Sequence, residues 1–126
     1  MRAVDTNLLV RLFALDDAKQ SEKVEGYIEF GAWVSHLVLA EAVWVFRSVY
    51  GASRESVIAA TEMLLTHDRL SLEDGDVVSR SVQLFAANPK VSFTDCLVHE
   101  IARKAGHTPL GTFDRALGKL PGAKTL

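Results

Sequence analysis

The chain has 126 residues, 48% of them hydrophobic and 24% charged, which is enough to build the core of one globular domain. Its longest nearly apolar stretch, Ala32–Phe46, is too short to span a bilayer and carries two polar ionisable residues. These features exclude a membrane-spanning protein and predict a single domain over residues 1–126.

Cysteine content and charge limit the compartment and the partners. The single cysteine, Cys96, excludes an internal disulfide, and no apolar segment typical of a secretory signal follows the first charges, so we expect a cytoplasmic protein. The formal net charge is −2, lower than nucleic-acid-binding proteins usually carry. If the four acids discussed below bind cations, the rest of the chain carries about +2, so net charge neither supports nor excludes a polyanionic substrate.

Short apolar strands alternate with longer helices along the chain. The predicted strands are Ala3–Val4, Ala32–His36, Arg69–Leu72, Thr108–Thr112 and an edge strand at Ala123–Leu126. The predicted helices begin near Leu8 and then cover Asp16–Gly31, Leu37–Tyr50, Ser53–His67, Asp76–Ala87, Asp95–Gly106 and a single turn at Arg115–Gly118. This alternation predicts an α/β fold with three α/β/α layers and a central parallel sheet of four to five short strands.

Acidic residues follow two of the predicted strands. Asp5 comes after the first strand, and Asp114 comes after Thr112. Ligands of open α/β sheets bind at the carboxyl ends of the strands, and right-handed crossovers place those ends along one edge. Both residues also suit the N-cap of the helix that follows, so capping stays an alternative for each.

Glu41 is the only charged residue in the apolar segment Leu37–Phe46. An ionised carboxylate in apolar surroundings costs several kcal/mol unless it is paired, hydrogen-bonded or bound to a metal. We therefore consider three interpretations: a metal ligand, a solvent-facing residue, and a partner of Arg47 or another base. Asp95 also has two interpretations, a functional acid or a residue of a helix cap, because Ser92 and Asp95 have the spacing of a capping box.

The topology brings Asp5, Glu41, Asp95 and Asp114, hereafter the four acids, towards one edge of one sheet. Four carboxylates in one pocket repel each other unless a cation compensates their charge. A set of oxygen ligands without His or Cys suits Mg²⁺ or Mn²⁺ better than zinc. Such ions activate a bound water and offset charge on a phosphoryl group, which points to metal-dependent cleavage of phosphodiesters.

The sequence resembles the PIN-domain ribonucleases and, among them, the VapC-type toxins of prokaryotic toxin–antitoxin pairs. The segments that carry the resemblance occur in the family's order over nearly the whole chain: Val4-Asp5-Thr6-Asn7, Leu39-Ala40-Glu41, Phe93-Thr94-Asp95 with Ala102–Gly106 after it, and Gly111-Thr112-Phe113-Asp114.

The resemblance implies an endoribonuclease that acts on single-stranded RNA with Mg²⁺ or Mn²⁺ and leaves a 5′-phosphate and a 3′-hydroxyl. It implies that Asp5 and Asp95 are the principal metal ligands and that Glu41 completes the site or helps to activate water. Asp114 matches the family's fourth acid. The resemblance also implies a homodimer that a small antitoxin inhibits.

Three further residues have candidate supporting roles. By the resemblance, Thr112 orients a ligand or water, and Asn7 supports Asp5. Arg115, beside Asp114, is the best candidate for a contact to phosphate, whereas a solvated face explains the other cations of the second half, such as Lys90 and Lys119, equally well.

The alternative function is a non-catalytic α/β module that binds RNA or protein. Receiver domains and aspartate-based phosphatases fit less well. A receiver needs adjacent acids on its first strand and a Lys on its last, and such a phosphatase needs a second Asp where this chain has Asn7. A PIN-like domain that only binds remains the main competitor.

Overall fold

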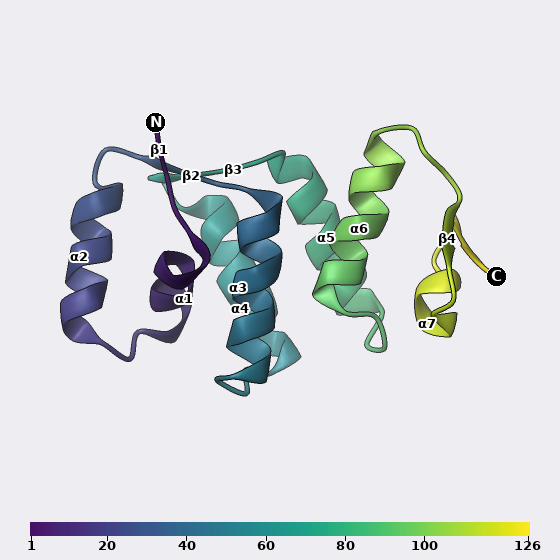
Figure 1. The fold of residues 1–126 in the computed structure, drawn as a ribbon, viewed down its shortest axis with the longest axis horizontal. Coiled ribbons are helices and arrows are strands. Elements are labelled where there is room, and N and C mark those ends of the chain that lie inside the picture. Colours follow the sequence, from purple (N-terminus) through teal and green to yellow (C-terminus); the bar gives the residue numbers. More distant parts are fainter. The chain divides into compact units, whose positions relative to one another are not determined.

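The structure, a computed structural model, describes all of residues 1–126 and divides them into two compact units, residues 1–75 and 76–126. The chain forms seven helices and five short strands, and every pair of neighbouring strands is parallel (Figure 1). The predicted α/β class with short parallel strands is therefore confirmed. Most element boundaries differ from the predicted ones by only a few residues.

The first unit contains a three-stranded parallel sheet with strand order β1-β2-β3. Its elements, in chain order, are β1 (Arg2–Ala3), α1 (Thr6–Ala14), α2 (Ala18–Ile28), β2 (Ala32–Val34), α3 (His36–Ser48), α4 (Arg54–Thr66) and β3 (Leu70–Leu72). Arg2 pairs with Ala32, and Ala32 pairs with Leu70, so the three strands begin at the same edge.

Helix packing builds the core of the first unit. α1 lies between α2 and α3, and α4 packs on β3 and α3 (Figure 1). The rings of Phe13 and Phe46 join α1 to α3 with their centroids 5.3 Å apart. Leu9, Leu39 and Leu64 are among the residues that these helices bury completely or nearly so. The apolar faces of these amphipathic helices therefore pack against each other and against the sheet.

The connection from α2 to β2 depends on a glycine. Gly31 has φ +97°, in the region that residues with a Cβ rarely adopt, and its N–H donates to the Ile28 carbonyl at 2.8 Å. Gly31 therefore forms the turn that follows this helix. The helix itself ends three residues before the predicted end, at Ile28.

The second unit contains a two-stranded parallel sheet and the remaining helices. Its elements are α5 (Gly75–Ala87, beginning at the unit boundary), α6 (Phe93–Lys104), β4 (Leu110–Thr112), α7 (Arg115–Gly118) and β5 (Ala123–Thr125). The rings of Phe85 and Phe93 meet edge to face at 5.7 Å and join α5 to α6. α7 packs closely on β5, because a Cβ added at Gly118 would lie 1.8 Å from Thr125 Oγ1.

None of the seven helices combines the length and the apolar character that crossing a bilayer requires.

Two leucines of α3 test which face of this helix the core covers. Leu39 is 1% exposed and Leu37 is 69% exposed. We expect Leu39→Ala to lower the free energy of unfolding by about 2–5 kcal/mol, because it removes buried methyl groups and leaves a cavity. Leu37→Ala should change it by less than about 0.5 kcal/mol. Urea unfolding measures both, and equal losses would contradict this assignment of the faces.

Candidate functional site

Asp5 lies where β1 ends and α1 begins. The Val4 N–H donates to the Trp33 carbonyl, which continues the pairing of β1 with β2 up to Asp5. Asp5 then has extended backbone angles and caps α1, with its Oδ1 accepting a hydrogen bond from the Leu8 N–H at 3.0 Å. The capping interpretation is therefore confirmed. The cap uses one carboxylate oxygen, and the exposed side chain leaves the second oxygen open to a ligand.

Glu41 lies on the solvent side of α3, as the solvent-facing interpretation predicts, and not in an apolar environment. Leu37, Glu41 and Trp44 follow each other at helical spacing on one exposed face, whereas the core covers Leu39 and Val43 on another. The apolar sequence of α3 therefore does not report the burial of Glu41. The carboxylate also forms no ion pair with Arg47 or any other base.

A hydrogen bond joins Glu41 to the residue beside Asp5. The Thr6 hydroxyl donates to Glu41 Oε2 at 2.8 Å, across the interface between α1 and α3. Because Thr6 follows Asp5 directly, this bond holds two of the four acids at the same end of the first unit. No sequence motif assigns this role to Thr6, and the only signal for it is a hydroxyl directly beside Asp5.

Asn7 makes no hydrogen bond to Asp5 in the structure. Its side chain is exposed and lines a small hollow between α1 and α2, together with Arg11, Gln20 and Lys23. The role predicted for Asn7, support of Asp5, therefore stays a prediction.

Asp95 lies in the first turn of α6 and is half-buried. Ser92 caps this helix, and its hydroxyl oxygen accepts a hydrogen bond from the Asp95 N–H at 3.1 Å. The structure thus contains the serine half of the predicted capping box. The Asp95 carboxylate itself accepts no hydrogen bond and forms no ion pair, so it is open to a cation.

Asp114 follows β4 and caps α7. Its Oδ1 accepts a hydrogen bond from the Leu117 N–H at 2.8 Å, and the Asp114 N–H donates to Thr112 Oγ1 at 3.0 Å. Thr112 therefore fixes the turn that presents the exposed Asp114 carboxylate. A direct action of Thr112 on a ligand or water stays a prediction.

The four acids divide equally between the two units. Asp5 and Glu41 belong to the first, and Asp95 and Asp114 to the second. Neither unit by itself gathers three His, Cys, Asp or Glu side chains that could hold a metal ion. Mg²⁺ nevertheless needs only one or two protein carboxylates, since waters and substrate phosphates supply its other ligands. The chemistry of these donors, all oxygen and none paired with a base, fits that ion.

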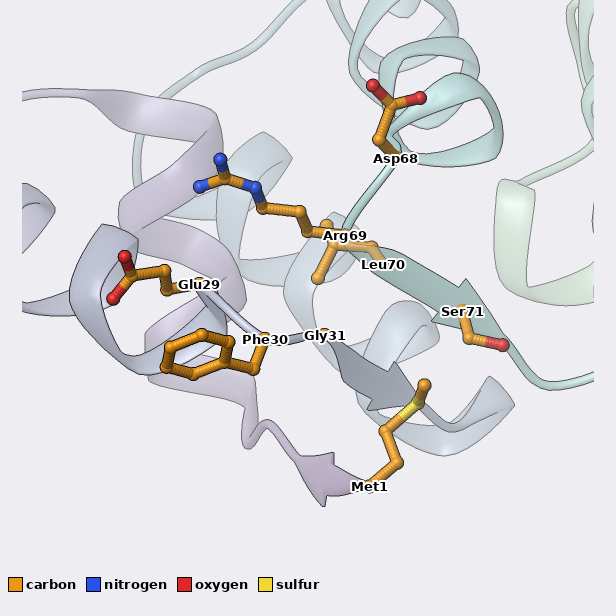
Figure 2. A pocket seen from close by; sticks show the side chains of 8 residues that line it. All are labelled: Met1, Glu29, Phe30, Gly31, Asp68, Arg69, Leu70 and Ser71. Atoms are coloured by element: carbon orange, nitrogen blue, oxygen red, sulfur yellow. The ribbon is translucent and has the colours of Figure 1, made fainter.

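A different hollow opens at the amino ends of the strands in the first unit. It has a volume of about 380 Å³, and Figure 2 shows eight residues that line it, from Met1 before β1 to Ser71 in β3. The carboxylates of Glu29 and Asp68 lie on separate sides of Arg69 and do not point towards each other (Figure 2). This hollow therefore does not offer a paired-carboxylate site, and it lies at the opposite strand ends from Asp5.

Comparison with known proteins identifies a family. The model of the PIN domain matches residues 2–123, nearly the whole chain. This match confirms the resemblance to PIN domains that the sequence motifs indicate, and it agrees with the α/β/α fold. The VapC-type subclass stays a prediction. Searches of curated proteins and of solved structures returned no match.

The hydrogen bond between Thr6 and Glu41 can be measured by a double-mutant cycle. We expect Thr6→Val and Glu41→Ala to be coupled by about 0.5–1 kcal/mol in the free energy of unfolding, because either change removes the same hydrogen bond. Urea unfolding of the wild type, the two single variants and the double variant gives this coupling energy.

Thr66→Val is the matched control, because the Thr66 hydroxyl bonds only to carbonyls of its own helix, α4. Combined with Glu41→Ala it should be additive within about 0.5 kcal/mol. A Thr6 cycle as additive as the control cycle would show that the bond does not hold Glu41 in solution.

Proposed function

The chain belongs to the PIN domain family, and on that premise we propose that it is a Mg²⁺- or Mn²⁺-dependent endoribonuclease. PIN domains are in general metal-dependent nucleases that usually bind divalent ions such as Mg²⁺, so a nucleic acid is the expected substrate. The observation that carries the proposal is the Thr6–Glu41 hydrogen bond. It ties Glu41 of α3 to the residue that follows Asp5 at the start of α1.

We assign the ion to the four acids. Asp5 and Asp95 are its principal ligands, and Glu41 and Asp114 complete the site. When bound, the ion activates a water molecule and offsets the negative charge of the phosphate that is attacked. All four side chains supply carboxylate oxygens, and none is occupied by a neighbouring base.

The residues around the acids orient them. The Leu8 N–H fixes one oxygen of Asp5 and directs the other outwards, and the Leu117 N–H does the same for Asp114. The Thr6 hydroxyl occupies Glu41 Oε2, which leaves Oε1 to accept a proton from the attacking water. Such preset positions reduce the reorganisation that the reaction needs.

The proposed reaction is hydrolysis. The water oxygen bonds to phosphorus, the bond between phosphorus and the 3′-oxygen breaks, and the 3′-oxygen takes up a proton. The products are a 5′-phosphate and a 3′-hydroxyl. We assign to Arg115, directly after Asp114, a contact to a phosphate of the substrate.

The biological role that we propose is that of a toxin in a toxin–antitoxin pair in the cytoplasm. The order of the motifs around Asp5, Glu41, Asp95 and Asp114 supports this role, because it matches VapC-type toxins. The expected partners are RNA, a small cognate antitoxin and a second copy of the chain in a homodimer.

Asp5→Asn separates capping from metal binding. Asn caps helices about as well as Asp, so the fold should be retained, but the substitution removes the negative charge that holds a cation. We expect cleavage of single-stranded RNA in the presence of Mg²⁺ or Mn²⁺ to fall at least about 100-fold. Gel analysis of labelled RNA measures the rate, with EDTA as the metal-free blank.

Asp17→Asn is the matched control. Asp17 caps α2 as Asp5 caps α1, accepting a hydrogen bond from the Gln20 N–H at 3.0 Å, but it is not one of the four acids. This variant should cleave RNA at the wild-type rate. If Asp5→Asn is equally active, Asp5 is only a cap. If the wild type also binds no Mn²⁺ by calorimetry, the chain is a binding module and not a nuclease.

A further inference from the structure

A basic hollow lies within the second unit, between the α5–α6 connection and α7. It has a volume of about 500 Å³. Its lining combines Lys90 of the connection with Arg115 and Lys119 of the α7 segment, and no acidic residue takes part. Both segments belong to residues 76–126 (Figure 1), so the hollow does not depend on the first unit. The structure therefore brings Lys90 together with two cations that lie at least 25 residues further along the sequence.

The three cations have no negative partner in the protein. Lys90, Arg115 and Lys119 are exposed, and none of them forms an ion pair or a side-chain hydrogen bond. Like charges gathered around one concave surface raise its positive potential and concentrate anions there. An ordinary solvated face does not require such a grouping, so the hollow favours a binding role for Lys90 and Lys119 over mere solvation.

The walls of the hollow are held by local hydrogen bonds. The Asn88 side chain donates to the Leu84 carbonyl at 2.9 Å, and the Val91 N–H donates to the Asn88 carbonyl at 3.0 Å. On the other side, Asp114 caps the segment that carries Arg115. The cations therefore project from backbone that is already ordered, which lowers the entropy lost when a ligand binds.

We propose that this hollow binds the phosphodiester backbone of the RNA substrate, at phosphates next to the one that is cut. The inference rests on the proposed function and extends it by a substrate-binding track. Arg115 directly follows Asp114, so the hollow adjoins one of the four acids within the same unit. Guanidinium and ammonium groups around a concave surface suit a run of phosphates, which carry one negative charge each.

The test compares two variants that lose the same charge. The hollow variant is Lys90→Gln, Arg115→Gln and Lys119→Gln. The control variant is Lys19→Gln, Arg80→Gln and Lys124→Gln, which removes three exposed cations without ion pairs outside the hollow. Binding of a labelled single-stranded RNA is measured in EDTA at several salt concentrations, so that no cleavage occurs.

We expect the hollow variant to lower the slope of log Kd against log salt by about 2 and to weaken binding about 100-fold at about 0.1 M salt, because each lost phosphate contact removes about 0.7 of a released counterion on a single strand. The control variant should lose much less. Equal losses in the two variants would overturn the proposal. A hollow variant that binds RNA like the wild type but no longer binds a poly-glutamate peptide would also overturn it, because the hollow would then bind an acidic protein segment.

The two failures are distinguishable. If the wild type cleaves RNA with Mg²⁺ and the hollow variant keeps the wild-type salt slope, the proposed function stands and this binding track does not exist. If the wild type neither binds nor cleaves single-stranded RNA, both are overturned.

Discussion

One hydrogen bond between two helices sets the geometry of the candidate site in the first unit. The Thr6 hydroxyl, at the start of α1, holds the Glu41 carboxylate of α3 at 2.8 Å. The packing of α1 on α3 supports this bond. The Phe13–Phe46 ring pair strengthens the same interface.

Capping and ligand binding are compatible roles for the aspartates. Asp5 and Asp114 each use one oxygen to accept a backbone hydrogen bond at a helix N-terminus, at 3.0 and 2.8 Å respectively. A carboxylate has lone pairs on both oxygens, so a cap fixes its orientation without exhausting its capacity. At Asp95 a different residue, Ser92, supplies the cap, and the carboxylate remains outside the helix hydrogen bonds. Local helix chemistry thus positions three of the four acids.

Much of the fold and of the candidate site could be predicted from the sequence, because the signals are local. Periodicity and capping residues located the helices and strands, and ordered motifs indicated the family that the match over residues 2–123 confirms. The environment of Glu41 could not be predicted, because an apolar helix sequence does not say which face the core covers. The grouping of Lys90 with Arg115 and Lys119 also escaped prediction, because it depends on how the α5–α6 connection meets α7.

The central proposal is that Asp5, Glu41, Asp95 and Asp114 hold one or two divalent ions. Anomalous X-ray scattering from crystals grown with Mn²⁺ tests it most directly, since the signal locates the ion independently of any assay. The account predicts an anomalous peak bound by the carboxylates of Asp5 and Asp95. A peak that none of the four acids binds, or crystals with Mn²⁺ in the buffer and no peak on the protein, would contradict it.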